Sequence, residues 1–152
     1  MATLIYLHGF LSSPGSYKAQ QVKQWLADER PDIRYLCPHL TPYPERTREQ
    51  LQNLVEGLGT ERIFLMGSSL GGFWATWLAE QYDLRAVLIN PSVRPWEFMP
   101  EYLEVDLKSY HTDDRYRLEA HHVEQIKALD VARPSRPENY WSLPWEPAET
   151  RK

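Results

Sequence analysis

The stretch that decides the fold begins with Ile63-Phe64-Leu65-Met66, continues through Gly67-Ser68-Ser69-Leu70-Gly71-Gly72 and ends in an apolar segment that reaches Tyr82. Glycines stand two positions before and two positions after Ser69, which is the G-x-S-x-G pattern of a sharp turn between a strand and a helix. Such a turn leaves no room for side chains at the glycines, and it holds the serine hydroxyl out at the C-terminal edge of a parallel sheet. The pattern therefore predicts a nucleophile elbow with Ser69 at its tip.

The residues on both sides of Ser69 fit this prediction. Four apolar residues are enough for a buried parallel strand. After the turn, apolar side chains recur at helical spacing, so that one helix face can pack on the sheet. These side chains are Leu70, Phe73, Trp74, Trp77 and Leu78. The alternative is a Gly-Ser turn without chemistry, and we favour the elbow because strand and helix are both in register with the motif.

The bulk properties indicate one globular domain over residues 1–152, long enough to bury a core. Hydrophobic residues make up 42% and charged residues 25%, and the net charge of −4 favours neither nucleic acid nor an anionic membrane as a partner. No apolar segment has the length of a membrane span, and Met1 leads directly into a strand, which leaves no room for a signal peptide. The single Cys37 favours a reducing, cytoplasmic location.

Short apolar segments alternate with amphipathic segments along the chain, which predicts a parallel sheet with helices on both faces. Four further strands are expected, at residues 3–7, 33–37, 84–89 and 140–143. Residues 144–152 are expected to form an irregular tail.

Three further helices are expected from their entry signals and apolar faces. The first begins at Ser13-Pro14 and reaches about Asp28. The second has Thr47 and Gln50 at capping-box spacing, with apolar residues up to position 58, and the third lies around 118–129. The segment 91–102 is expected either to cover the site as a lid or to pack on the sheet edge.

Acyl transfer by a serine also needs two donors for the oxyanion. The elbow puts the amide of Leu70 beside the developing charge, and a second amide usually comes from the loop after an early strand. The segment His8-Gly9-Phe10 ends the first predicted strand, and Gly9 allows close approach of the backbone. The amide of Phe10 is therefore the second candidate donor, against the alternative of an ordinary glycine turn.

Four blocks of the sequence resemble the small bacterial YqiA-like esterases (UPF0227) of the α/β-hydrolase superfamily. They are Tyr6-Leu7-His8-Gly9-Phe10 with Ser12-Ser13-Pro14, Pro42-Tyr43-Pro44, the elbow with Ala75-Thr76-Trp77, and Asn90-Pro91 with Val93-Arg94-Pro95. The resemblance extends over about residues 2–143. It implies a three-layer α/β sandwich with a mainly parallel sheet, and an esterase of short acyl esters with no metal or organic cofactor. It also implies Ser69 as nucleophile and Phe10 and Leu70 as oxyanion donors.

The C-terminal part departs from the family pattern. Members of the family continue with a strand followed by Gly-Asp and then a Gly-Asn-His segment, which supply the acid and base of the triad. Here the matching strand at 140–143 is followed by Pro144-Trp145-Glu146-Pro147, and no histidine follows His122. We therefore expect a truncated α/β-hydrolase fold with an exposed sheet edge. A homodimer is expected through such an edge or through the tail.

The general base must then come from another histidine. Of the five, His122 and His111 are the two candidates. The family counterpart of His8 is structural, and His39 and His121 are expected to be solvated. A metal site is not expected, because the spacing of the ligand-type residues matches no standard signature. Those residues are His111, Asp113, Asp114, His121 and His122.

Two functions follow from these observations. The first is a serine esterase that hydrolyses a small-molecule carboxylic ester through an acyl-enzyme at Ser69, impaired if the base is lost. The second is a catalytically silent α/β protein that binds a ligand or a partner at the same site.

Overall fold

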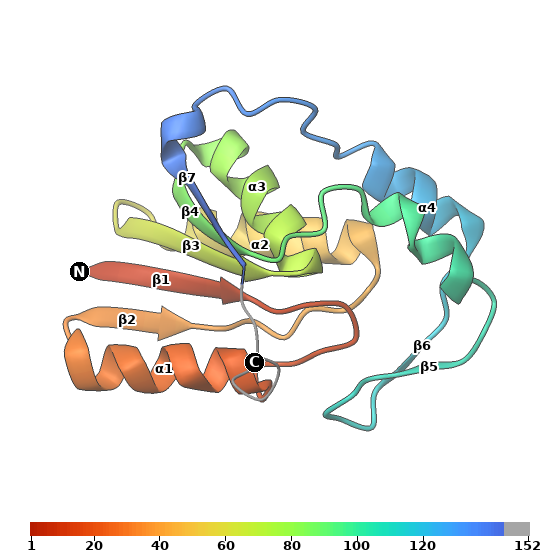
Figure 1. Ribbon diagram of the computed structural model, residues 1–152, viewed down its shortest axis with the longest axis horizontal. Coiled ribbons are helices and arrows are strands. Elements are labelled where there is room, and N and C mark those ends of the chain that lie inside the picture. Colours follow the sequence, from red (N-terminus) through yellow and green to blue (C-terminus); the bar gives the residue numbers. More distant parts are fainter. Residues whose placement is uncertain (145–152) are drawn as a thin grey trace.

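The computed structural model describes residues 1–144, and its architecture is a five-stranded parallel sheet with helices on both faces (Figure 1). The strand order is β2-β1-β3-β4-β7. The strands are β1 (Ala2–Leu7), β2 (Ile33–Leu36), β3 (Arg62–Ser68), β4 (Arg85–Ile89) and β7 (Tyr140–Leu143). The helices are α1 (Tyr17–Glu29), α2 (Pro44–Gly57), α3 (Leu70–Tyr82) and α4 (Ala120–Lys127). The five predicted strands and four predicted helices are confirmed.

The main core lies between the sheet and helices α2 and α3. Register aligns Ile5 of β1 with Leu65 of β3 and Leu65 with Ala86 of β4, so these side chains share one face. They pack with fully buried Leu51 of α2 and Leu78 of α3. The apolar period of each helix thus faces the apolar side of the strands, as its spacing predicted.

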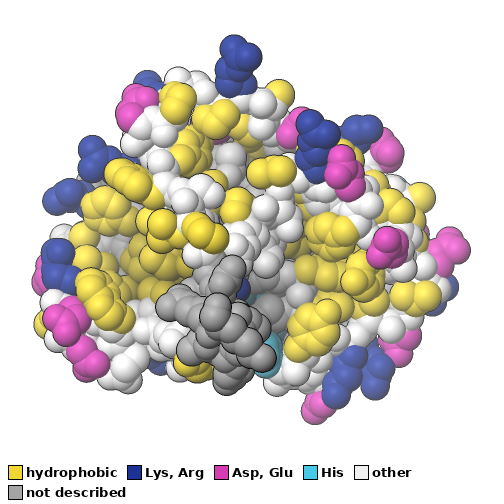
Figure 2. Space-filling view, viewed as in Figure 1, with side chains coloured by type: hydrophobic (Ala, Val, Ile, Leu, Met, Phe, Trp, Pro, Cys, Tyr) yellow, Lys and Arg dark blue, Asp and Glu magenta, His cyan; other side chains and the backbone are white. Residues whose placement is uncertain are grey.

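The opposite face of the sheet is only partly covered. Helix α1 packs there over β1 and β2, and the hydroxyl of Tyr35 donates a 2.9 Å hydrogen bond to the carbonyl of Ala19. On the strands beyond, Trp141 and Leu143 of β7 are each 51% exposed, and Figure 2 shows apolar side chains gathered over this part of the sheet. Within residues 1–144, β7 lies at an edge of the sheet. The homodimer through this edge stays a prediction.

Two helix entries differ from the expectation. Ser13 and Pro14 form a turn in which Ser13 Oγ accepts from the Gly15 amide at 3.0 Å, and α1 begins only after Ser16, its N-cap. Proline fits the second position of such a turn as well as the first position of a helix, so the pair Ser-Pro was ambiguous.

The second difference concerns the start of α2. This helix begins at Pro44, three residues before the expected cap, because proline is already set for the first helical position. The Thr47 hydroxyl instead donates from inside the helix to the carbonyl of Thr41 at 2.9 Å, and the side-chain Nε2 of Gln50 donates to the carbonyl of His39 at 2.9 Å. The predicted capping box of Thr47 and Gln50 was therefore wrong.

The segment between β4 and α4 contains short elements only. Two single turns, η1 (Pro95–Glu97) and η2 (Met99–Tyr102), are followed by a two-stranded antiparallel hairpin of β5 (Leu107–Lys108) and β6 (Arg115–Tyr116). A third single turn, η3 (Pro137–Asn139), precedes β7. The hairpin was not predicted, because two-residue strands leave no periodic signal. No helix within residues 1–144 is long and apolar enough to cross a bilayer.

Candidate active site

Ser69 stands between β3 and α3 in a strained backbone conformation, with φ 54° and ψ −119°. A positive φ on a residue other than glycine costs on the order of 1–3 kcal/mol, so neighbouring structure must hold it. The Ser69 amide donates to the carbonyl of Ile89 at 3.0 Å, and its carbonyl accepts from the amides of Gly72 and Ser92 at 2.9 Å each. The end of β4 and the loop after it therefore fix the conformation of Ser69.

The three glycines around Ser69 have no space for a side chain. A Cβ on Gly67 would lie 2.2 Å from the carbonyl oxygen of Gly71, and a Cβ on Gly71 would lie 1.9 Å from that of Leu7. A Cβ on Gly72 would lie 2.7 Å from the Cβ of Pro91. These contacts bring the start of α3 against the ends of β1 and β4, so the turn is as tight as its glycines predicted.

Two backbone amides beside Ser69 are available as donors. Phe10 and Leu70 both line the pocket that Ser69 borders, and within the described part of the chain neither amide donates a hydrogen bond to another residue. Gly9 lies against the serine, since a Cβ built on it would be 3.4 Å from the Ser69 Cβ. Two unsatisfied N–H groups at one end of a parallel sheet can bind a negatively charged oxygen.

His8 holds the loop that contains the Phe10 amide. Its ring is buried, Nε2 accepts from the Leu40 amide at 2.8 Å, and Nδ1 lies 2.9 Å from the Gly9 carbonyl. Since Nε2 accepts, the proton belongs on Nδ1, which donates to Gly9. Burial lowers the pKa of His8 to about 4, because the cation would lose its solvation. His8 is therefore a neutral structural residue, as the family pattern implied.

Ser69 borders an open pocket of about 560 Å³, a size typical of small-molecule sites. Phe98, from the segment between η1 and η2, lines it and packs edge-on against Phe10, with ring centroids 5.4 Å apart. The segment 91–102 thus forms one wall of the pocket. The lining residues are Tyr6, Gly9, Phe10, Ser12, Ser16, Tyr17, Lys18, Ser68, Ser69, Leu70, Ser92, Phe98, Tyr110 and His111.

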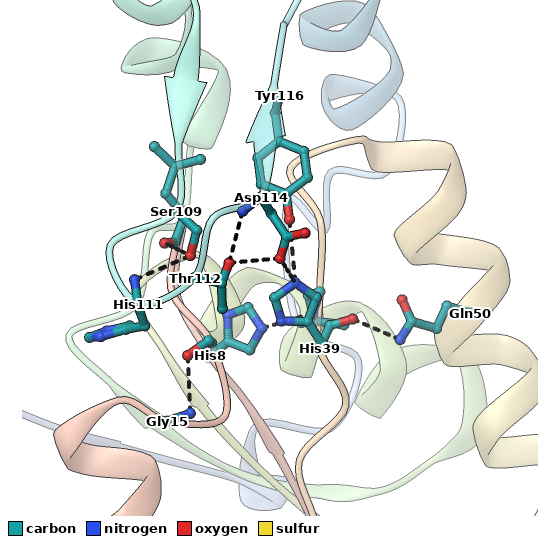
Figure 3. A network of polar contacts seen from close by, with 12 residues as sticks. His8, Gly15, His39, Gln50, Ser109, His111, Thr112, Asp114 and Tyr116 are labelled. Atoms are coloured by element: carbon teal, nitrogen blue, oxygen red, sulfur yellow. Dashed lines mark hydrogen bonds and ion pairs between the residues drawn. The ribbon is translucent and has the colours of Figure 1, made fainter.

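The loop of the β5–β6 hairpin brings His111 to this pocket (Figure 3). The hairpin is fastened to the loop after β1, because the Tyr110 amide and the Ser109 hydroxyl both donate to the carbonyl of Leu11, at 2.9 and 3.2 Å. Ser109 Oγ also accepts from the His111 amide at 3.3 Å. Among residues 1–144, no carboxylate pairs with the His111 ring. His111 is the only histidine among the described residues that line the Ser69 pocket.

His39 connects the hairpin to the loop before α2, which corrects the expectation that it is merely solvated. Its Nε2 lies 3.3 Å from Asp114 Oδ2 and 3.3 Å from the Tyr116 hydroxyl (Figure 3). Asp114 in turn accepts from the Thr112 hydroxyl at 2.7 Å. The side chain of His39 is 36% exposed, so the pair is a surface interaction that supports the hairpin.

The other candidate base, His122, lies in a different place. Its Nδ1 accepts from the Glu119 amide at 2.9 Å as part of the capping box of α4, and its ring packs 5.2 Å from that of Tyr43. It lines a second groove of about 450 Å³ and not the Ser69 pocket. His121, beside it, is exposed and 3.4 Å from Glu119. Within residues 1–144, no three metal-ligating side chains gather.

Several pocket residues had no signal in the sequence. Lys18, in the first turn of α1, points its Nζ toward Ser68 Oγ at 3.4 Å, and Tyr110 and Ser92 lie in loops. Their positions follow from the packing of α1 and the hairpin on the sheet, which no local pattern specifies.

The model of UPF0227, an uncharacterised protein family, matches residues 3–148. The chain belongs to this family. The UPF0227 protein YcfP of Salmonella gallinarum is 30% identical over 167 residues, which cover 98% of this chain and 89% of YcfP. About a tenth of that relative lies outside the match. The expectation that members of the family continue with the segments that supply the triad acid and base stays a prediction.

Comparison with solved structures shows that this chain has the α/β-hydrolase fold. Mouse alpha/beta hydrolase domain-containing protein 10 matches with a TM-score of 0.62 at 15% identity, over 85% of this chain and 62% of the mouse chain. A structure of the metagenome-derived lipolytic enzymes LipS and LipT matches with a TM-score of 0.55 at 15% identity, over 95% of this chain and 83% of that one. The predicted fold is therefore confirmed, and its solved neighbours include hydrolases.

Proposed function

We propose that the protein is a serine hydrolase that cleaves small carboxylic esters through an acyl-enzyme at Ser69. The observation on which this rests is the strained Ser69 backbone at the edge of a pocket, beside two amides that donate to no acceptor within residues 1–144. Strain at a serine persists only where surrounding structure enforces it, and such sites are often functional. A hydroxyl next to two oriented N–H groups has the arrangement that acyl transfer uses.

In this proposal Ser69 Oγ attacks the ester carbonyl carbon while His111 accepts the hydroxyl proton. The amides of Phe10 and Leu70 stabilise the resulting oxyanion. The carbon–oxygen bond to the alcohol then breaks, and the alcohol leaves with the proton from His111. Water attacks the acyl-enzyme in the same way, which releases the acid and restores Ser69. No metal or organic cofactor takes part.

Hydrolysis of p-nitrophenyl acetate and butyrate by the full chain tests the nucleophile. We expect the Ser69→Ala variant to lose activity by about 10³-fold or more. Ser142→Ala, on β7 and outside the pocket, is the matched serine control and should keep wild-type activity. A fluorophosphonate probe should label the wild type and Ser142→Ala but not Ser69→Ala. Equal inertness of all three chains would overturn the proposal and favour the catalytically silent binding protein.

The base is tested by comparing His111→Gln with His122→Gln. Loss of a general base typically reduces the rate by about 10²- to 10⁴-fold, and we expect this for His111→Gln. His122→Gln should show no comparable loss, because His122 lies in the other groove. The reverse result would assign the base to His122.

A further inference from the structure

The described lining of the Ser69 pocket has a charge composition unlike that of the chain. The chain has 21 acidic and 17 basic residues, for a net charge of −4. Among the described residues that line the pocket there is no aspartate or glutamate, whereas the ammonium group of Lys18 is present. Clefts lined by charges of one sign concentrate ligands of the opposite sign. The pocket is therefore suited to a ligand that bears a negative charge.

Lys18 is held close to the proposed reaction centre. Its Nζ lies 3.4 Å from the hydroxyl of Ser68, the residue directly before Ser69, and Ser68 also hydrogen-bonds Tyr6 of β1. The lysine is half-buried, and its burial lowers its pKa because the ammonium loses part of its hydration. A partly desolvated cation gains more from an anion than an exposed one does.

The pocket is also lined by residues with neutral hydroxyl groups. Ser12, Ser16 and Ser92 line it, from the loop after β1, the N-cap of α1 and the loop after β4. Hydroxyl donors together with an ammonium are a common way to bind a carboxylate, because each donor satisfies a different lone pair.

We propose that this pocket selects esters that carry a carboxylate close to the scissile bond, and that Lys18 is the residue that selects them. This inference rests on the proposed function and names its substrate class. The carboxylate would join or replace the contacts that Lys18 makes in this structure. The ester then lies with its carbonyl at Ser69 and its anionic end at α1.

Two esters with the same leaving group provide the test, mono-4-nitrophenyl glutarate and 4-nitrophenyl butyrate. We expect the full chain to prefer the anionic ester by about tenfold in kcat/KM, which a charge-assisted hydrogen bond can supply. The ratio should fall to about one in Lys18→Met and be largely kept in Lys18→Arg, which retains the charge. Lys23→Met, on the exposed side of the same helix, should keep the wild-type ratio. High salt should reduce the preference.

A second pair of esters, 4-butyryloxybenzoate and phenyl butyrate, tests on which side of the scissile bond the carboxylate binds. In 4-butyryloxybenzoate the carboxylate is on the alcohol side of the ester. A Lys18-dependent preference in either pair supports the inference and locates the carboxylate. Ratios within twofold of one in both pairs, or ratios unchanged in Lys18→Met, would overturn it even if Ser69-dependent hydrolysis is found.

A binding measurement decides the inference if no ester is hydrolysed, in which case the proposed function alone has failed. Monomethyl glutarate and methyl butyrate would be titrated into the Ser69→Ala chain and followed by NMR. The inference is supported if the Ser69→Ala chain binds the anionic ester more tightly than the neutral one, and if this difference disappears in the double variant Ser69→Ala, Lys18→Met. Equal binding of the two esters, or no binding of either, overturns it.

Discussion

The two sides of the Ser69 pocket are built differently. On the elbow side, Ser69 and Gly71 are held by buried backbone of three parallel strands, with no space for an added carbon. On the hairpin side, His111 is positioned by hydrogen bonds from its neighbours Ser109 and Tyr110 to a single carbonyl, that of Leu11. The comparison teaches that Ser69 and the two candidate donor amides are fixed by the sheet, whereas the candidate base can shift at little cost. Mutations on the elbow side should therefore reduce the free energy of unfolding more than mutations on the hairpin side.

The largest loss of stability is expected from Gly71→Ala. The new methyl group would lie 1.9 Å from the carbonyl oxygen of Leu7, so β1 or α3 must move. We expect a loss of about 3 kcal/mol or more in the free energy of unfolding, measured by urea denaturation. Gly57→Ala, at the open end of α2, is the control and should be neutral or slightly stabilising. A mild effect of Gly71→Ala would contradict the rigid elbow side.

The next largest loss of stability is expected on protonation of His8, which holds the loop that contains the Phe10 amide. Its pKa is about 4 in the folded chain and about 6.5 when unfolded, so below pH 6.5 the unfolded state binds a proton that the folded state does not. Stability should therefore fall as the pH drops from about 6.5 to 4, by about 3 kcal/mol. Unfolding curves of the wild type and His8→Asn at several pH values test this. Parallel pH profiles of the two chains would contradict it.

A smaller effect is expected from Ser109→Ala on the hairpin side. The change removes the hydroxyl that donates to Leu11 and accepts from the His111 amide, in a buried position. We expect a loss of about 1–2 kcal/mol in stability, and a larger relative loss of esterase rate because His111 is displaced. Urea denaturation and p-nitrophenyl butyrate hydrolysis measure the two effects. If the rate follows stability alone, the hairpin does not position the base.

The smallest effect is expected from Asp114→Asn, which weakens the contact with His39. Both side chains are partly exposed, at 51% and 36%, and surface ion pairs contribute little. A change of about 0.5 kcal/mol or less in the free energy of unfolding is expected. A loss above about 1 kcal/mol would show that the hairpin side is held more firmly than its contacts indicate.

The same division explains what the sequence could predict. The elbow side rests on local patterns, since the apolar period around Ser69 and the spacing of Gly67 and Gly71 directly encode strand, turn and helix. The hairpin side rests on contacts between distant residues, such as Ser109 with Leu11 and Asp114 with His39. Sequence periodicity contains no information on such contacts.

Lys18 and His111 illustrate the limit for the site. In the sequence, Lys18 was one basic residue among several and His111 was one of two candidate bases. What distinguishes both is the pocket that they share with Ser69. The entry of α2 shows the opposite case, in which local information was present but misread. Pro44 marked the helix start, and the capping-box spacing at Thr47 was coincidental.

The strand order has a consequence for synthesis on the ribosome. In the order β2-β1-β3-β4-β7, β2 and β3 join opposite edges of β1, β4 joins the free edge of β3, and β7 joins the free edge of β4. Every new strand thus finds an existing edge, and none must insert between two strands that are already paired. The chain can therefore assemble its sheet while it is being translated, from the N-terminus onward.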